Sequence, residues 1–333
     1  MKLRVGSVEN MNENFVEESV VINSDVILKG TIAIPESDSE KLPAVLLVNG
    51  SGGADRDGNM KKPEVKSNIY KELAHFITSL GFITLRYDKR AVGESEGDPY
   101  TSGMMDLVSD ITSNVKFLQN HERVDSSKII LIGHSEGCIL STIASTITPV
   151  AGIVLISGAG TNLREPLVYQ NAQVIEEVKT LKGLKGFILR IAVSEKKLQK
   201  QQDDLYNIMV NSTEDIVRFK GKKMPAKWFR EHFKYTSEDI LEILSNATCE
   251  ILAVTGDKDA QANSNDLKSV QELGKENIKT VVIKNMDHML KEFTGEKTVL
   301  NIMKQYKEEA SKPMHFELKA ILEQWLSKFN ENI

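Results

Sequence analysis

The chain of 333 residues has few of the features that would make it a disulfide-bonded, secreted or membrane-spanning protein. Its two cysteines, Cys138 and Cys249, both sit in apolar runs, so we expect two buried thiols in a reducing compartment and no disulfide framework. No run approaches the ~18 apolar residues of a membrane span. The first ten residues contain no apolar segment of a secretory signal. We therefore expect a cytoplasmic protein without a membrane span.

An excess of charge of one sign is also missing. The 42 basic and 47 acidic residues are interspersed and leave a net charge of −5, which argues against a nucleic-acid partner. The histidines and cysteines lack the spacing of metal ligands, and no glycine-rich segment matches a phosphate-binding loop. We predict no metal and no cofactor. The sequence leaves open whether the chain forms a homo-oligomer.

What the sequence does contain is an alternation of short apolar runs with longer amphipathic segments. Because such alternation is typical of a doubly covered parallel sheet, we predict an α/β fold with a mostly parallel eight-stranded sheet and helices on both faces. The predicted strands are residues 20–22, 26–34, 43–49, 82–87, 129–132, 153–156, 251–254 and 279–283. The predicted helices between them are residues 69–80, 104–119, 138–147 and 265–273.

This alternation stops between residues 161 and 246, where no strand-like run occurs. The stretch is rich in Lys, Glu and Gln, and its periodicity predicts helices at residues 163–181, 184–211, 213–219 and 226–235. We interpret residues 161–246 as a helical cap inserted into a core of residues 1–160 and 247–333. A peripheral helical decoration is the alternative interpretation.

The most informative motif follows the strand at residues 129–132. It reads Gly133-His134-Ser135-Glu136-Gly137 and precedes an apolar helical segment. Gly-x-Ser-x-Gly between a strand and a helix predicts a sharp turn that exposes the serine hydroxyl, with glycines where side chains would collide. Ser135 is therefore the predicted nucleophile. The same pattern recurs around Ser95, but a polar loop follows it and no helix, so we interpret Ser95 as a loop residue.

A serine nucleophile needs an imidazole base that a carboxylate orients, and in this fold the three follow the chain order serine, acid, histidine. His288 is the one histidine that follows a late strand, so it is the predicted base. The strand at 251–254 runs into Asp257 and Asp259. We favour Asp259, which lies deeper in the turn, and keep Asp257 as the alternative acid.

The oxyanion formed during acyl transfer needs two backbone N–H donors. We predict that they belong to Glu136, directly after the nucleophile, and to Ser51 in the glycine-rich segment 49–53. The charged segment 54–59 follows, and we expect Arg56 and Asp57 to support the oxyanion loop through ion pairs.

Taken together, these segments resemble the α/β-hydrolase superfamily, and within it the capped bacterial acyl esterases, also described as serine-aminopeptidase-like hydrolases. The segments that carry the resemblance are residues 49–58, 87–95, 133–137, 228–235, 256–261 and 308–325, the last resembling the group's final helix. The resemblance implies that the acid is the last residue of Gly-x-x-Asp, Asp259. Two positions depart from the group's pattern: Ala91 replaces a glycine, and Asn49 replaces a histidine.

The resulting hypothesis is a serine hydrolase that cleaves small carboxylic esters through an acyl-enzyme. Trp228, Phe229 and Phe233 are predicted to line an apolar pocket for this small-molecule ester substrate, although aromatic residues at helical spacing also suit the core of the cap. A thioesterase or a small-peptide or amide hydrolase would use the same residues. A non-catalytic ligand-binding protein of this fold is the alternative from another class.

Overall fold

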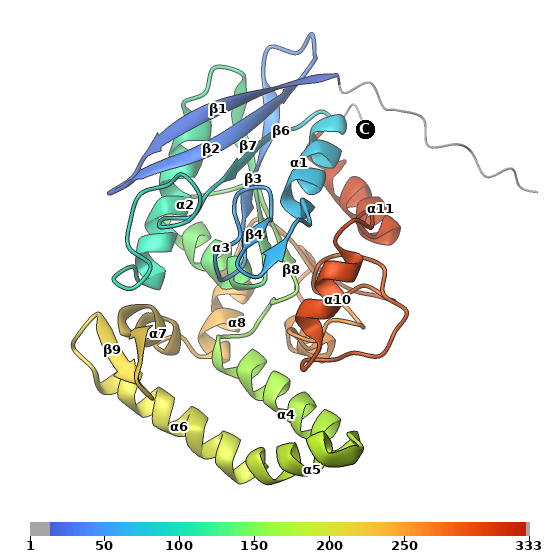
Figure 1. Cartoon of the computed structure of the whole chain (residues 1–333). Helices are drawn as coiled ribbons and strands as arrows, with labels where there is room; N and C mark the ends of the chain where they lie inside the picture. Colours follow the sequence, from blue (N-terminus) through green and yellow to red (C-terminus); the bar gives the residue numbers. More distant parts are fainter. Residues whose placement is uncertain (1–13, 331–333) are drawn as a thin grey trace, which may run out of the picture.

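The central sheet has eight strands and lies between helices in the larger part of the molecule, with α4 to α6 outside it (Figure 1). The computed structural model describes residues 14–330. The first ten residues, in which the sequence shows no secretory signal, lie outside the described residues. In spatial order the strands are β1 (Phe15–Asn23), β2 (Ile27–Pro35), β6 (Ile83–Tyr87), β3 (Leu42–Val48), β7 (Val124–His134), β8 (Gly152–Ile156), β11 (Glu250–Gly256) and β12 (Ile278–Ile283). The pairs β1–β2 and β2–β6 are antiparallel and the others parallel, which confirms the predicted sheet.

Helices cover both faces of the sheet, so the molecule has two cores. One face packs against α2 (Met104–Gln119), α3 (Glu136–Ile147), α8 (Ser237–Asn246) and α9 (Leu267–Gln271). The other face packs against α1 (Ile69–Ser79) and α11 (Phe316–Leu326). The remaining short elements of the core are β4 (Met60–Lys61), β5 (Glu64–Val65), the 3-10 turn η1 (Ser264–Asp266) and α10 (Ile302–Glu309).

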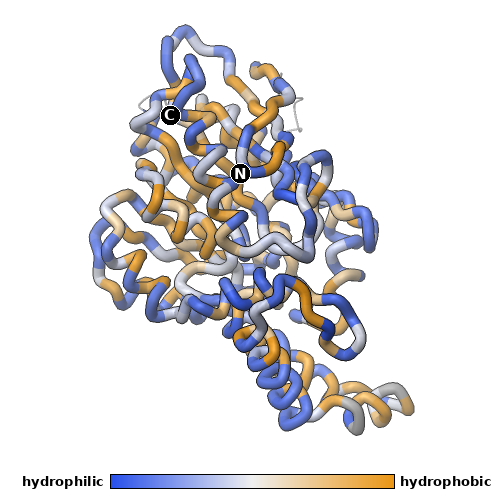
Figure 2. The backbone as a smooth tube through the Cα atoms, turned by 90° about the vertical axis from the view of Figure 1, so that its left-hand side faces the viewer, coloured by the Kyte–Doolittle hydropathy of each residue, from blue (hydrophilic) through white to orange (hydrophobic). Residues whose placement is uncertain are grey.

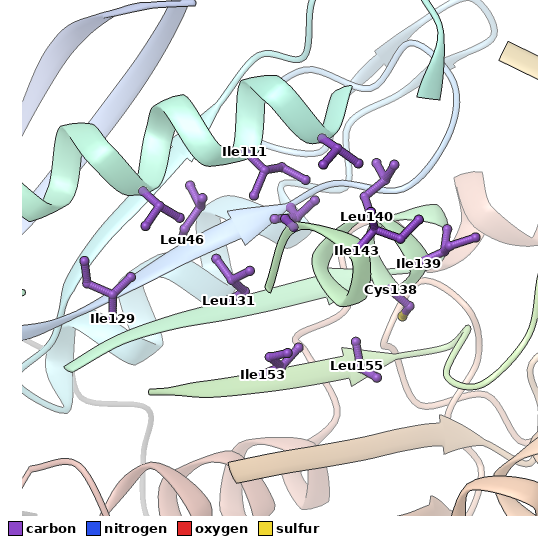
Figure 3. Close-up of a cluster of buried hydrophobic side chains, with 14 of the residues drawn as sticks. Leu46, Ile111, Ile129, Leu131, Cys138, Ile139, Leu140, Ile143, Ile153 and Leu155 are labelled. Carbon is purple, nitrogen blue, oxygen red and sulfur yellow. The ribbon is translucent and has the colours of Figure 1, made fainter. Parts of the chain in front are cut away.

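The central strands divide their side chains between these two cores. In β3, Leu46 belongs to the first core and Leu47 to the second, because successive strand residues point to opposite faces. Figure 3 shows the first core, where Leu46 and Leu131 lie beneath α2 and α3. Cys138 lies in this core, whereas Cys249, also expected to be buried, is only partly buried. Strands buried on both faces explain the unbroken apolar runs of the sequence.

The long insertion between β8 and β11 is not purely helical. It comprises α4 (Arg164–Thr180), α5 (Gly183–Ala192), α6 (Glu195–Asn211), the hairpin of β9 (Ile216–Phe219) and β10 (Lys222–Pro225), α7 (Ala226–Phe233) and α8. Figure 1 shows α4 to α6 extending away from the sheet. Among residues 14–330, no helix is both long and apolar enough to cross a bilayer.

Three predicted helices were wrong in their extent or type. Residues 213–219 lead into a hairpin, because Lys220 and Gly221 both adopt positive φ, 49° and 77°, as a tight hairpin turn requires. The helix predicted at 184–211 is two helices, since Ser194 caps α6 by accepting a hydrogen bond from the N–H of Lys197. The final helix expected within 308–325 is interrupted between α10 and α11, where Pro313 lies.

A sharp turn joins β7 to α3 at the level of Ser135, which has φ 56° and ψ −121°. The turn is possible because its neighbours are glycines. A Cβ on Gly133 would lie 2.2 Å from the carbonyl oxygen of Gly137, and a Cβ on Gly137 would lie 2.1 Å from that of Val48. Such distances are far below van der Waals contact, so the strand, the turn and the helix can approach one another only without side chains at these positions.

This packing predicts that Gly137→Ala lowers the free energy of unfolding by about 2–3 kcal/mol, because the added methyl group must displace the backbone of β3. Urea unfolding followed by circular dichroism measures the change. Gly53→Ala is the matched control, since a Cβ there meets nothing within 4 Å. Equal unfolding midpoints for the two variants would contradict this account of the turn.

Candidate active site

The predicted acid and base meet at the carboxyl ends of β11 and β12. His288 Nδ1 lies 3.1 Å and 2.9 Å from the two carboxylate oxygens of Asp259, whose side chain is completely buried. Asp259 also accepts hydrogen bonds from the N–H groups of Gln261 and Ala262, both at 2.8 Å. Because a carboxylate can only accept, Nδ1 of His288 carries the proton and Nε2 is left as the acceptor.

The contact between the buried side chains of Asp259 and His288 shifts their pKa values in opposite directions. Burial alone would raise the pKa of Asp259, but His288 and the two amides lower it below its usual range. Burial alone would lower the pKa of His288, but the Asp259 carboxylate raises it above 6.5. Asp257, the alternative acid, accepts a hydrogen bond from the N–H of Asn285 at 2.6 Å. The carboxylate that contacts His288 is that of Asp259.

A chain of hydrogen bonds connects His288 to the turn that carries Ser135. His134 Nε2 lies 2.9 Å from the carbonyl oxygen of His288, and its Nδ1 lies 2.8 Å from the hydroxyl of Tyr70. That hydroxyl accepts the N–H of Gly50 at 3.1 Å. Burial and the nearby His288 lower the pKa of His134 to about 3, so the ring is neutral. A neutral ring with its proton on Nε2 satisfies every donor and acceptor in the chain.

Ser135 and His288 share no hydrogen bond among the described residues, but several contacts hold their loops together. The rings of His134 and His288 lie 4.8 Å apart. The N–H of Ser135 donates to the carbonyl oxygen of Ile156 at 2.8 Å, which fixes the turn to β8. Catalytic hydrogen bonds are often long before a substrate binds, so this geometry is compatible with a serine–histidine pair.

The carboxylate of Glu136, directly after Ser135, is enclosed by three donors from distant parts of the chain. Lys89 Nζ lies 3.1 Å from it, Trp228 Nε1 2.7 Å and His232 Nε2 3.0 Å. Burial alone would raise the pKa of Glu136, but Lys89 and His232 lower it to about 2. Glu136 is therefore ionised, and it joins the turn at Ser135 to α7 of the insertion.

Lys89 also positions the predicted oxyanion loop. Its Nζ donates to the carbonyl oxygen of Gly50 at 2.5 Å. A peptide group is planar and trans, so holding the Gly50 carbonyl fixes the direction of the Ser51 N–H on the opposite side of the same plane. That N–H has no hydrogen-bond partner in the part of the chain that the structure describes. The N–H of Glu136 begins α3, where the first amides lack partners within the helix.

Gly50 itself lies against the candidate nucleophile. A Cβ at this position would be 3.0 Å from Ser135 Cβ and 3.5 Å from its hydroxyl oxygen. Tyr70 holds the N–H of Gly50 and Lys89 holds its carbonyl group, so both sides of this residue are fixed. Two predicted amide donors and the Ser135 hydroxyl thus border the same small space.

The expected ion pairs of the charged segment 54–59 are present. Arg56 binds the carboxylate of Asp88 with two nitrogens, at 2.8 Å and 3.1 Å, and also pairs with Glu94. Asp57 pairs with the buried Arg86 at 2.7 Å. These contacts anchor the oxyanion loop to the end of β6. Asn49, one of the two departures, donates to the carbonyl oxygen of Asp55 within this loop.

The other departure, Ala91, adopts φ 64°, a left-handed conformation that explains why a glycine is common there. Next to it, Ser95 is fixed within its own loop. Its hydroxyl donates to the carbonyl oxygen of Asp88 at 2.7 Å and accepts the N–H of Lys29 at 2.9 Å. The second Gly-x-Ser-x-Gly match therefore forms no turn between a strand and a helix.

A cavity of about 260 Å³ opens beside Ser135 beneath the insertion. Its lining includes Ser51, Glu136, Trp228 and Phe229. Phe233 does not line it and instead packs against Tyr206 and Phe229 inside the insertion. A larger hollow of about 750 Å³ lies between α3 and α8 and contains none of the predicted site residues. We take the smaller cavity as the candidate substrate site because the reactive groups border it.

The insertion is attached to both loops of the candidate site. From α4, Tyr169, Gln170 and Gln173 donate to the carbonyl oxygens of Asp259, Gln261 and Ala260. From α7, Trp228 and His232 bind Glu136. Among residues 14–330, no group of three or more His, Cys, Asp or Glu is arranged to hold a metal ion.

Sequence reasoning did not identify Tyr70, Lys89, His134 and His232 as parts of this site. One available signal was the position of His134 inside the Gly-x-Ser-x-Gly motif, because a residue next to a nucleophile is held close to its partners. Lys89 and His232 lie in segments 87–95 and 228–235, which carry the resemblance, but the pattern assigned no role to either residue. Tyr70 lies in a predicted helix, and nothing in its local sequence distinguishes it from an ordinary helix residue.

Comparison with known proteins identifies the family of the chain. Residues 65–292 match the family described as serine aminopeptidase, S33. Esterase EstD of Thermotoga maritima is 28% identical over 299 residues, which are 88% of this chain and 64% of EstD. The chain therefore spans less than two thirds of that relative's length.

Among solved structures, esterase Pf2001 of Pyrococcus furiosus has a TM-score of 0.53 at 15% identity, with 98% of this chain and 97% of that chain covered. Est1E of Butyrivibrio proteoclasticus, solved with ferulic acid, has a TM-score of 0.54 at 17% identity, with 91% and 99% covered. Identities this low show the fold alone. The match over residues 65–292 shows more: the chain has the α/β-hydrolase fold and belongs to the serine aminopeptidase, S33 family.

Proposed function

We propose that this chain is a serine hydrolase that cleaves small carboxylic esters through an acyl-enzyme. One observation carries the proposal: Ser135, in a strained turn beside a cavity, lies on the segment that His134 joins to the buried His288–Asp259 pair. A relative named as an esterase, which matches 88% of this chain, supports the same conclusion. In this proposal, residues 161–246 form a cap over a core of residues 1–160 and 247–333.

In the first half of the reaction, Ser135 Oγ attacks the ester carbonyl carbon and its proton passes to His288 Nε2. The tetrahedral intermediate then collapses, the bond to the alcohol oxygen breaks, and the alcohol leaves with the proton from His288. A water molecule then attacks the acyl carbon and gives its proton to the same nitrogen. The second tetrahedral intermediate collapses, the bond from the acyl carbon to Ser135 Oγ breaks, and Oγ takes the proton back from His288 as the acid leaves. Asp259 stabilises the imidazolium that forms in each half, because its carboxylate is held ionised and in contact with Nδ1.

The negative charge that develops on the carbonyl oxygen is stabilised by the N–H groups of Ser51 and Glu136 in this mechanism. Such donors are effective when they are held in place before the reaction begins. Lys89 and Tyr70 supply that rigidity for the Ser51 side through Gly50. On the other side, α3 and the ionised Glu136 side chain fix the position of the Glu136 amide.

The size of the cavity favours a small acyl or alcohol group. A volume of about 260 Å³ lies just below the range that ligand pockets typically offer, roughly 300–1,000 Å³. Trp228 and Phe229 give one wall an apolar surface, while Phe233 contributes to the cap core instead. We therefore expect acetyl and butyryl esters to be cleaved faster than octanoyl esters.

The nucleophile is tested with p-nitrophenyl acetate, butyrate and octanoate. Ser135→Ala is expected to lower kcat by at least about 10⁴-fold, because no other group can form the acyl-enzyme. Ser95→Ala is the matched control, since it removes the serine of the second Gly-x-Ser-x-Gly segment, and its kcat is expected to stay near that of the wild type. If the wild type turns over no ester and a fluorophosphonate probe leaves Ser135 unlabelled, the proposal is overturned.

The acid and the base are tested by the pH dependence of kcat/KM. His288 acts only when neutral, and its pKa is raised above 6.5 by Asp259, so the rate is expected to fall as the pH drops through a value above 6.5. Asp259→Asn is expected to lower kcat by about 10³–10⁴-fold. Asp257→Asn is the matched control and should keep most of the activity. An equal loss in both variants would contradict the assignment of Asp259.

The role of Lys89 is tested by Lys89→Met, which removes the donor to the Gly50 carbonyl. We expect kcat to fall by about 10–100-fold with KM nearly unchanged, because the Ser51 N–H then loses its fixed direction. The single variant also leaves Glu136 without its lysine partner and is expected to be less stable.

A double variant separates these two effects. Lys89→Met with Glu136→Gln removes the unpaired charge but does not restore a donor to Gly50. It is expected to recover much of the stability in urea unfolding and to keep the low kcat. Full kcat in the double variant would show that Lys89 does not position the oxyanion loop.

A further inference from the structure

The short helix α5 lies at the far end of α4 and α6, away from the sheet (Figure 1), and Figure 2 colours much of this end as hydrophobic. Among its described side chains, three large apolar ones are exposed. Leu184, Phe187 and Ile188 are 75%, 56% and 55% exposed. Their spacing of three and four residues places them on one side of the helix. Single exposed apolar residues are common, but three neighbours on one helix form a patch that indicates a binding surface. We refer to these three residues as the α5 patch.

Basic residues surround the α5 patch in the sequence. Between residues 179 and 200 there is one acidic residue, Glu195, and there are seven basic ones: Lys179, Lys182, Lys185, Arg190, Lys196, Lys197 and Lys200. This local excess of positive charge contrasts with the net charge of −5 for the whole chain. Two acidic side chains, Glu176 and Glu195, are exposed nearby, and Glu176 pairs with Lys179. The remaining charge is still strongly positive.

A second copy of this chain would fit the α5 patch poorly. Three side chains of roughly 200 Å² each, exposed to this degree, offer about 350–400 Å², whereas a stable interface buries about 800 Å² per partner. A two-fold axis at the patch would also bring two basic segments together, and like charges repel. The combination of an apolar face and a basic surround matches a surface that is both apolar and negatively charged.

We propose that the α5 patch and its basic residues dock this chain onto the surface of an anionic lipid bilayer. The apolar side chains would enter the boundary between headgroups and acyl chains, and the exposed Lys182, Arg190 and Lys196 would lie at the level of the phosphates. The ten residues of α5 span about 15 Å, half of the ~30 Å hydrocarbon layer, so the helix lies in the interface and does not cross it. This docking does not depend on the proposed ester hydrolysis.

The experiment is co-sedimentation of the full chain with sucrose-loaded vesicles, either of phosphatidylcholine alone or with about 30% phosphatidylglycerol. We expect the wild type to bind the anionic vesicles at least about tenfold more tightly than the neutral ones, and to be released when NaCl is raised from about 0.05 M to about 0.5 M. Leu184→Ser with Phe187→Ser is expected to weaken binding to anionic vesicles by about tenfold or more.

A matched control removes two equally exposed apolar side chains elsewhere. Phe316 and Ile147 are 71% and 56% exposed, so Phe316→Ser with Ile147→Ser should bind vesicles like the wild type. Circular dichroism shows whether each variant is folded. Absence of wild-type binding at low salt, or an equal effect of the two double variants, would overturn the proposal. So would a dimer, measured by light scattering without vesicles, that only Leu184→Ser with Phe187→Ser abolishes.

Discussion

The buried carboxylate of Glu136 is the contact on which the arrangement of the site depends. A charge removed from water is tolerated only when it is paired and hydrogen-bonded, and here the donors are Lys89, Trp228 and His232. They come from the loop after β6 and from α7, so one carboxylate ties the turn at Ser135 to both the core and the insertion. Since Lys89 also holds Gly50, the same ion pair extends to the oxyanion loop. Loss of any one donor leaves part of this charge unsatisfied.

A second connection, made of neutral groups, reaches Gly50 from the other side. It runs from the carbonyl group of His288 through His134 and Tyr70 to the Gly50 N–H. With a pKa of about 3, His134 stays neutral at any pH near neutrality, so this connection keeps one proton arrangement. The two connections differ in kind, one ionic and one neutral. Together they fix the loop that faces Ser135 against both His288 and the α7 helix of the insertion.

The sequence predicted the sheet and the turn at Ser135, because these depend on local patterns. For the acid it favoured Asp259 but kept Asp257 as the alternative, and the contact with His288 is made by Asp259. Apolar runs indicate buried strands, and the glycines of the turn indicate that backbone segments approach closely there. The hairpin of β9 and β10 was missed because its signal is only Lys220-Gly221. The contacts of Lys89 and His232 with Glu136 could not be predicted, since these residues lie 47 and 96 positions from Glu136 in the sequence. The sequence alone does not say which lysine or histidine pairs with this carboxylate.

The insertion has one part that contacts the candidate site and another part, around α5, that lies away from it. Near the sheet, α4 and α7 are fixed by side-chain hydrogen bonds to the carbonyl groups of residues 259–261 and to Glu136. Farther out, α4 and α6 bury few side chains, Val178 and Met209, and the end of α4 is tied to the core through Glu177, which accepts hydrogen bonds from residues 298–300. In the part of the chain that the structure describes, the hydrogen bonds of Glu136 and Asp259 come from α4, α7 and the core, and none comes from α5. The proposed bilayer surface and the proposed reaction site can therefore change independently, because a substitution in the α5 patch removes no contact that holds these two carboxylates.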